Sequence, residues 1–384
     1  SQSADSDCYA GGKMRRTVIS IFIIMIAISC SEGQRDTSET DLSDTLNTVS
    51  ETGMSEWIGY LQSSDTGLWE DSESHSPFYV SLGFLTDPES IDPYVYNPYD
   101  FCISGDTVFV TDYSTQQIVA LNSSGDLLWK AGGEGEGPGE FPRISTIAVS
   151  PEFVAASNYY VNRIEYFHRD GSYAMSLTFS GAQGMVFQDD STLIVTSTLE
   201  NGGDIHRVHP ESGIIDSFGE VETHDYDEVQ RMDLIRVCTN GDNRLALYNR
   251  YEGLIAIYDL ETKSCVFRGQ RQLPATPTPP QNFTDSNGNS TRLFLPIGGN
   301  AFLGPDGMLN VVLTGFMEDG SFLSDPENID FAEYSSIDRY DWEGNYLDSY
   351  CLPDSCISHA GILPGDRLVA RDFSEGVLRM YERQ

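Results

Sequence analysis

Residues 108–130, VFVTDYSTQQIVALNSSGDLLWK, contain the pattern that decides the fold of this chain. An apolar run rich in Val and Phe is followed by polar residues, a second apolar run, a turn with Gly125 and a third apolar run. Short runs of β-branched and aromatic residues between Gly, Asn, Asp and Ser are typical of strands joined by tight turns. The stretch therefore predicts three strands of an antiparallel sheet.

The same pattern recurs along the rest of the sequence. The further copies are residues 153–177, 193–218, 245–267, 309–316 continued by 335–350, and 368–384. Each copy follows one more apolar strand and a short turn, as in Ser104-Gly105-Asp106. Four strands per unit, repeated about every 40 to 50 residues, are typical of propeller blades. We therefore predict an all-β, six-bladed β-propeller with four-stranded antiparallel blades.

The two ends of the repeat array indicate how the ring closes. The sixth copy stops at Gln384 without a fourth strand, whereas FYVSLGFL, residues 78–85, precedes the first copy without a blade of its own. We expect this N-terminal strand to complete the last blade, which removes exposed sheet edges. A β-sandwich is the alternative fold, but it explains neither six similar units nor the extra strand.

Residues 1–30 are interpreted as a leader with a lipoprotein signal peptide. Met14-Arg15-Arg16 precedes the apolar run VISIFIIMIAI, residues 18–28, and then Ser29-Cys30. This order is typical of a secretory signal, and the run is shorter than the roughly 20 residues of a bilayer-spanning helix. AISC resembles the lipobox of bacterial lipoproteins, which implies lipid attachment at Cys30. Because Ala27 stands where that family prefers Leu, cleavage by the ordinary signal peptidase is the alternative.

Residues 31–75 are predicted to be a polar, acidic tether, because they contain too few apolar residues to offset the entropy of ordering. Met54, Trp57, Ile58 and Leu61 recur at helical spacing and suggest one short amphipathic helix within it. The propeller itself is assigned to residues 76–384.

The charge balance excludes several kinds of partner. The 384 residues include 22 Lys and Arg against 59 Asp and Glu, a formal net charge of −37. A surface that follows a nucleic-acid backbone needs clustered cations, so nucleic acid is excluded as a partner. Attraction to anionic lipid headgroups is excluded for the same reason, which leaves the lipid anchor as the membrane contact. We expect a monomer, exported and anchored to the bacterial cell envelope, on its periplasmic or outer-membrane face.

A glycine-rich stretch, GGEGEGPGEF at residues 132–141, follows the first unit. A phosphate-binding loop would need Gly-Lys-Ser/Thr and a helix, whereas Pro138-Gly139-Glu140 stands in this stretch before a predicted strand. The stretch is therefore interpreted as a turn between blades. It resembles the GxGPGEF signature of bacterial six-bladed β-propeller proteins related to NHL-repeat propellers, many of them predicted lipoproteins. The resemblance implies a fold and a compartment, and it supplies no catalytic residue.

The lengths of the predicted loops distinguish the two faces of the ring. The connections between blades share one face with the loops between second and third strands. That face, called the long-loop face below, holds residues 134–143, 220–232, 270–296 and 318–334. Long loops on a rigid scaffold are where binding usually takes place.

We predict a ring of aromatic and arginine residues, with one histidine, around the channel mouth on the long-loop face. These residues are Tyr113, Arg143, Tyr159, Tyr160, Arg163, Arg250, Tyr251, His359 and Phe373. Such side chains stack on or hydrogen-bond a sugar or a peptide. The Asp and Asn residues that begin these loops have a simpler interpretation, since they can hydrogen-bond the backbone of their own turns.

No metal site is predicted and no cofactor is expected, although calcium or another divalent ion is left open. His206 and His209 are three residues apart on a strand, so their rings point to opposite faces. The acidic insert between Glu318 and Glu333 offers oxygen ligands to calcium, or is simply a solvated loop. Cys351 and Cys356 have the spacing of a small disulfide loop in an oxidising compartment. Cys102, Cys238 and Cys265 are predicted to be core residues.

Two classes of function are consistent with this sequence. We favour an envelope-anchored lipoprotein, not an enzyme, whose propeller binds a glycan, peptide or envelope protein through its long-loop face. The alternative is a metal-dependent propeller hydrolase, lactonase or lyase with its site at the central channel. Such a site needs several oxygen or imidazole ligands on the inner strands. The predicted inner strands are mostly apolar, with only Asn300 and His359 near their starts as ligand candidates.

Overall fold

The structure is a computed structural model, and its described residues fall into eleven ranges. These are 60–61, 79–86, 93–158, 161–221, 235–250, 253–271, 281–284, 290–293, 298–313, 335–354 and 357–383. The chain divides into two units, one of which joins residues 1–57, 278–295 and 319–330. The described part of that unit is a hairpin of β19 (Gln281–Thr284) and β20 (Ser290–Leu293). The other unit contains all remaining strands.

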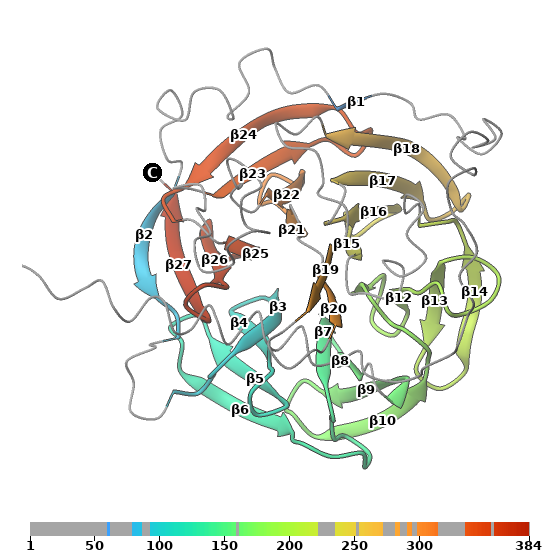
Figure 1. Cartoon of the computed structure of the whole chain (residues 1–384), viewed down its shortest axis with the longest axis vertical. Coiled ribbons are helices and arrows are strands. Elements are labelled where there is room, and N and C mark those ends of the chain that lie inside the picture. The colour runs from blue at the N-terminus through green and yellow to red at the C-terminus, as the bar shows by residue number, and fades with distance from the viewer. Residues whose placement is uncertain are drawn as a thin grey trace, which may run out of the picture. The chain divides into compact units, whose positions relative to one another are not determined.

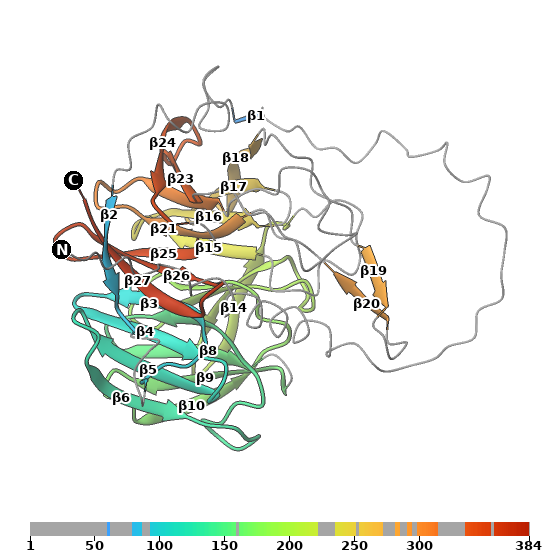
Figure 2. The same ribbon diagram turned by 60° about the vertical axis from the view of Figure 1, so that its left-hand side comes forward.

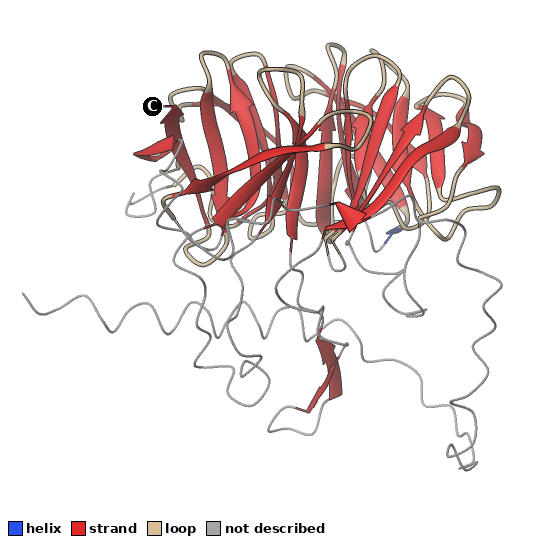
Figure 3. Cartoon of the chain, turned by 90° about the horizontal axis from the view of Figure 1, so that it is seen from above, coloured by secondary structure: helices blue, strands red, loops and turns tan. Residues whose placement is uncertain are grey.

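Six antiparallel sheets form a ring in this second unit, which confirms the predicted six-bladed β-propeller (Figure 1). From its inner to its outer strand, the first blade contains β3 (Pro98–Ser104), β4 (Thr107–Asp112), β5 (Gln117–Asn122) and β6 (Leu127–Gly132), and the second contains β7 (Ile144–Val149), β8 (Phe153–Asn158), β9 (Arg163–His168) and β10 (Tyr173–Thr178). In the same order, the third contains β11 (Met185–Phe187), β12 (Leu193–Thr196), β13 (Ile205–His209) and β14 (Gly213–Phe218), and the fourth contains β15 (Ile235–Thr239), β16 (Arg244–Asn249), β17 (Leu254–Asp259) and β18 (Ser264–Arg271). The fifth contains β21 (Gly298–Leu303), β22 (Leu309–Leu313), β23 (Ser335–Tyr340) and β24 (Tyr346–Leu352), and the sixth contains β25 (Ile357–Leu363), β26 (Arg367–Asp372), β27 (Val377–Arg383) and β2 (Tyr79–Phe84). Loops join the strands at both ends (Figure 3).

The N-terminal strand closes the ring as predicted. β2 pairs antiparallel with β27, so residues from opposite ends of the chain complete the sixth blade (Figure 2). Tyr79 of β2 is buried, and its ring lies 5.5 Å from that of Tyr350 on the fifth blade. The closing strand is thus held by ladder hydrogen bonds and by packing.

The core is divided among the seams between neighbouring blades. At the seam of the first two blades, Phe109 packs in one cluster with Phe141 of the connecting loop and Phe167 of the second blade. The second strands are buried almost throughout, because a neighbouring blade covers each of their faces. The outer strand β6 instead alternates between half-buried and exposed residues.

Parts of the sequence interpretation fall on residues that are not described. The leader, Cys30 and most of the tether lie outside the described ranges. Of the helix expected from Met54 to Leu61, only Tyr60 and Leu61 are described, and they form β1, a strand parallel to β18. Cys356 is also outside, so its disulfide with Cys351 stays a prediction. Within the described part of the chain, no helix is long and apolar enough to cross a membrane.

Candidate binding site

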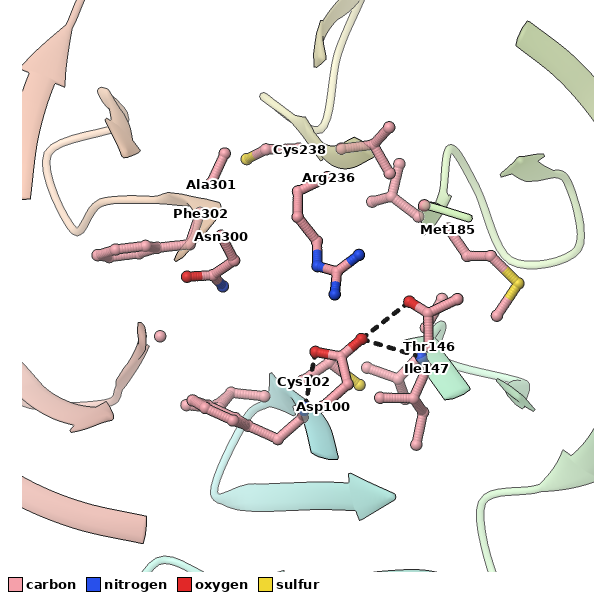
Figure 4. A pocket seen from close by; sticks show the side chains of 18 of the residues that line it. Asp100, Cys102, Thr146, Ile147, Met185, Arg236, Cys238, Asn300, Ala301 and Phe302 are labelled. Atoms are coloured by element: carbon pink, nitrogen blue, oxygen red, sulfur yellow. Dashed lines mark hydrogen bonds between the residues drawn. The ribbon is translucent and has the colours of Figure 1, made fainter. Parts of the chain in front are cut away.

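The six inner strands surround one cavity of about 270 Å³ in the central channel, and their starts lie at the same end of it. Each inner strand begins where a connection from the preceding blade enters it, so this end of the channel belongs to the long-loop face. The first lining residues of the six strands are Asp100, Thr146, Gly184, Arg236, Asn300 and Ala360. Four of these six carry polar side chains, and Figure 4 shows that the guanidinium of Arg236 points into the centre. This tier is called the polar end of the channel.

Residues two positions further along each strand give the cavity a different lining. They are Cys102, Ala148, Val186, Cys238, Phe302 and Ile362. Among the described lining residues, Asp100 and Arg236 are the two that carry a formal charge. The channel therefore passes from a polar end to an apolar interior.

Irregular strand pairing accompanies the polar end. The register shifts at the start of β3, between Pro98 and Asp100, and at the start of β25, between Ile357 and His359. β7 and β21 show similar shifts before Ile147 and Ala301. A bulge inserts a residue into one strand and redirects the neighbouring side chain, and bulges are common beside functional sites.

Asp100 is a buried carboxylate that joins the first two blades. Its Oδ1 accepts a hydrogen bond from the backbone N–H of Phe101 at 2.8 Å. Its Oδ2 accepts from Thr146 Oγ1 at 2.8 Å and from the N–H of Ile147 at 3.3 Å. Such bonds compensate a buried charge for its lost hydration. Asp100 therefore brings one stabilised negative charge to the polar end.

His359 lies beside Asp100, with only 1% of its surface exposed. Arg236 Nε donates to His359 Nε2 at 3.4 Å, so Nδ1 carries the proton of the neutral ring and faces Ser358 Oγ at 3.0 Å. Burial lowers the pKa of His359 well below 6.5, and the charges of Arg236, Arg250 and Arg371 lower it further. The Asp100 carboxylate, 3.7 Å from Nε2, favours the charged ring, but burial and three guanidinium groups outweigh it.

Arg250 and Arg371 surround this group from the fourth and sixth blades. Arg371 Nη1 donates to Ser358 Oγ at 2.9 Å, and its Nε donates to the carbonyl of Pro98. Arg250 Nε donates to the carbonyl of Gly298 at 3.1 Å. Burial lowers the pKa of Arg371 to about 10, and Arg250 and Arg236 act in the same direction. All three arginines stay charged at neutral pH, so the described surroundings of His359 include three positive charges and the carboxylate of Asp100.

Asn300 has a bracing role in place of the ligand role considered from sequence. Its Nδ2 donates to the carbonyl of Ala360 at 2.9 Å, and its Oδ1 accepts from the N–H of Ala360 at 2.8 Å. These two bonds join the inner strands of the fifth and sixth blades in the manner of a short ladder. The adjacent Gly299 allows this close approach, since a Cβ there would lie 2.0 Å from the carbonyl oxygen of Ser358.

The structure brings some of the predicted mouth residues together. His359 lies beside Asp100 of the polar end, and the charge of Arg250 acts on the pKa of His359. Tyr113 contacts Arg143, whose guanidinium lies 5.6 Å from the centre of the tyrosine ring, and stacks on Tyr99 at 5.8 Å. Phe373 follows Asp372 at the end of β26. Tyr159, Tyr160 and Tyr251 lie outside the described residues.

Arg163 holds the glycine-rich loop instead of facing the channel. Its Nη2 donates to the carbonyl of Gly137 at 2.8 Å, and its Nε pairs with Glu165. Glu165 in turn accepts from the N–H of Gly139 at 3.1 Å. Gly132 has φ of 90°, and a Cβ there would lie 2.8 Å from the ring of Phe141. These contacts describe a turn between blades, as the sequence indicated.

The aspartates that begin the second-to-third-strand loops bind their own turns. Asp112 Oδ1 accepts from the N–H of Ser114 at 3.0 Å, and Asp372 Oδ1 accepts from the N–H of Ser374 at 3.0 Å. These two residues therefore support the simpler interpretation. Two arginines near Asp372 have different partners. Arg371 donates to Ser358 Oγ, next to His359, whereas Arg379 pairs with Asp372 itself.

The described residues contain no group of three His, Cys, Asp or Glu side chains placed to hold a metal ion. His206 and His209 have different partners: the ring nitrogens of His206 bond Ser217 Oγ and the carbonyl of Ser197, whereas His209 Nδ1 accepts from the N–H of Glu211.

Sequence reasoning missed Asp100, Thr146, Arg236 and Arg371. Arg236 stood inside the predicted inner strand LIRVCT, and Asp100 stands directly before the predicted strand FCIS. One usable signal was a charged residue at the same end of two inner strands.

Comparisons with known proteins support the fold. No protein-family model matches the chain, and no curated protein matches it significantly. The structure of a candidate exported protein from Bacteroides fragilis is similar over 85% of this chain and 99% of that chain, with a TM-score of 0.51 and 13% identity. The structure of virginiamycin B lyase from Staphylococcus aureus matches 80% of this chain and 88% of that chain, with a TM-score of 0.45 and 14% identity. At 13% identity, the similarity to the Bacteroides structure shows a shared fold between the two chains and nothing about function.

Proposed function

We propose that this protein is a binding module that takes a small ligand into the polar end of its channel from the long-loop face. The observation that carries the proposal is Arg236, a charged side chain only 4% exposed, at the wall of a 270 Å³ cavity. Burying charge is costly, and well-packed apolar residues often replace buried ions without loss of stability. A charged channel centre is therefore better explained by binding than by folding.

Binding is favoured over metal-dependent hydrolysis or elimination because of how the described donors are used. Both oxygens of Asp100 accept hydrogen bonds, and Nε2 of His359 accepts from Arg236. The amide of Asn300 braces two strands. A cation would also have to approach three guanidinium groups, which repel it.

We further propose export and lipid anchoring at Cys30, as the leader sequence predicts. The test is metabolic labelling with a palmitate analogue in a bacterial host. We expect label on the wild-type protein and none on Cys30→Ala. Equal labelling of both proteins, or of neither, contradicts the anchor without affecting the channel site.

Thermal melting tests the channel function. The protein is melted in chelator, in calcium, zinc, magnesium or manganese, and with a panel of small acids, amines and sugars. A ligand at 100 times its Kd adds about 2.7 kcal/mol, which is a few degrees for a domain of this size. We expect a metal-independent rise that Arg236→Gln removes and that Arg383→Gln, an exposed control at the end of β27, retains. A metal-specific rise that chelator reverses would instead support the enzyme alternative.

A further inference from the structure

We propose that the ligand of the channel is a small neutral carboxamide, whose amide group binds the inner edge of β25 at Ile362. The amide oxygen accepts from the N–H of Ile362, and the amide nitrogen donates to the carbonyl of the same residue. This inference rests on the channel site proposed above, and it names the chemical class of the ligand.

The inner strand of each blade is an edge strand, because within the described sheets it pairs on one side only. In an antiparallel ladder, every second residue directs its N–H and C=O groups away from the neighbouring strand. On the inner strands these groups point to the channel. Backbone groups that are removed from bulk water need a partner in the protein, a bound water or a ligand. The channel wall therefore offers hydrogen-bonding groups even where its side chains are apolar.

At the polar end, two side chains already bind such edge groups. Asp100 accepts from the N–H groups of Phe101 and Ile147. Asn300 binds both groups of Ala360, since its Oδ1 accepts from the N–H at 2.8 Å and its Nδ2 donates to the carbonyl at 2.9 Å. A carboxamide, which has both an acceptor and donors, is thus the group that the fold itself places against the edge of β25.

Ile362 presents the same pair of groups two residues further along β25. β26 pairs with Ala360 and with Ile362, and no register shift separates them. Because Ala360 directs its N–H and C=O to Asn300, the alternation of the ladder directs those of Ile362 to the same side. Ile362 lines the cavity, and no side chain in the described part of the chain bonds its backbone. Figure 4 shows the ring of Phe302, from the neighbouring blade, turned away from the channel centre.

The surroundings of Ile362 favour a neutral ligand over a charged one. Asp100 and Arg236, the two described lining residues with a formal charge, lie at the polar end and have hydrogen-bond partners there. Burial raises the pKa of the Cys238 thiol to about 12 and holds the pKa of Cys102 well above 9, so both thiols are uncharged at neutral pH. A charged group beside them would lose hydration without a counterion, whereas an amide forms two hydrogen bonds.

The size of the cavity limits the body of the ligand. Its 270 Å³ is the volume of about nine waters. A carboxamide of about nine non-hydrogen atoms, such as benzamide, matches this space. Acetophenone and benzoate have the same number of non-hydrogen atoms, but a methyl group or a charged oxygen replaces the amide nitrogen. Neither can donate to the carbonyl of Ile362, so they are matched controls for the hydrogen bonds.

An NMR titration of the whole protein, labelled with ¹⁵N-isoleucine, tests the affinity and the location together. The probes are benzamide, acetophenone and benzoate. We expect benzamide to shift the amide peak of Ile362. We also expect it to bind about 10-fold more tightly than either control, because the controls leave the carbonyl of Ile362 without a donor.

Two substitutions at one position separate the backbone from the side chain. Ile362→Val keeps the N–H, identifies the peak by its absence, and should bind benzamide as the wild type does. Ile362→Pro removes an N–H that makes no ladder bond to β26, and it should lower the affinity at least about 10-fold. Binding to this variant is followed at Ile103, which lines the same cavity. If its melting curve shows that it does not fold, the order of probe affinities in the wild type still decides.

The outcomes separate this inference from the function on which it rests. If acetophenone or benzoate binds in the channel as tightly as benzamide, the carboxamide inference is wrong and the channel function stands. The same holds if Ile362→Pro folds and binds benzamide like the wild type. If no probe shifts an isoleucine peak of the channel, the carboxamide inference is also wrong, and the thermal melting panel then decides the channel function.

Discussion

His359 is a buried imidazole whose surroundings make acid conditions unfavourable to the fold. Burial and the nearby Arg236, Arg250 and Arg371 hold its pKa well below 6.5, and the carboxylate of Asp100 only partly opposes them. In the unfolded chain the same ring takes up a proton near pH 6.5. Below that pH the unfolded state therefore binds more protons than the folded state, so stability falls as pH falls.

We predict that this one ring makes wild-type stability more sensitive to acid than that of His359→Asn. Between pH 6.5 and pH 5.5 the wild type should lose about 1 kcal/mol more of its free energy of unfolding than the variant. Urea denaturation at several pH values measures both proteins. Parallel pH dependences would mean that the ring takes up its proton over the same pH range in the folded and the unfolded protein, which contradicts a neutral imidazole beside three arginines.

Glu165 is a buried carboxylate with a structural role. It pairs with Arg163 and accepts from Gly139 N–H, so it connects the second blade to the glycine-rich loop. Glu165→Gln should lower the free energy of unfolding by about 2 kcal/mol, because the charge-assisted bonds weaken while the shape is kept. Glu134→Gln, an exposed change in the same loop, should stay within about 0.5 kcal/mol of wild type. Similar urea curves for the two variants would contradict this role.

At the level of elements, the N-terminal strand β2 is the part of the chain that closes the ring. Tyr79→Ala removes a buried ring and should cost about 3–5 kcal/mol in the free energy of unfolding. Leu82→Ala on the same strand is the matched control, because Leu82 is 47% exposed and its loss should cost less than about 0.5 kcal/mol. Urea denaturation curves of both variants measure these free energies of unfolding. Equal, small effects would mean that β2 contributes little to closure.

The strands were predictable because each one follows from a short stretch of sequence. The polar end was not predictable in this way, because it brings together residues that are far apart in the sequence. Alternating apolar runs, turns with Gly and the unmatched strand at residues 78–85 specify blades and closure. The convergence of Asp100, Arg236 and His359 depends on six strand starts meeting across the ring. Register shifts before Asp100 and His359 also change which way a side chain points, and simple alternation does not reveal them.

The candidate residues show the same division. His359 and Arg250 were chosen for their position at the mouth, and the structure places them in the cluster. Arg163 was chosen on the same ground, but its guanidinium binds Gly137 and Glu165. An arginine that completes a site and one that braces a loop look alike in sequence, because what differs is the partner that folding brings to them.

For the molecule as a whole, the net charge of −37 has a measurable consequence. Like charges on a compact surface repel one another, and salt shortens the range of that repulsion from about 30 Å at 0.01 M to about 3 Å at 1 M. Raising potassium chloride from 0.02 to 0.5 M should therefore raise Tm by several degrees. Differential scanning calorimetry across this range provides the check. A constant or falling Tm would mean that exposed ion pairs outweigh the net repulsion.

The channel connects residue, element and molecule, because residues from all six blades form its polar end and the closed ring holds them together. The most direct test is a crystal structure of the protein soaked with 4-bromobenzamide and measured at the bromine absorption edge. We expect an anomalous bromine peak inside the channel, between the inner strands of the six blades. An empty channel, with bromine only on the outer surface, would contradict a binding site in the channel.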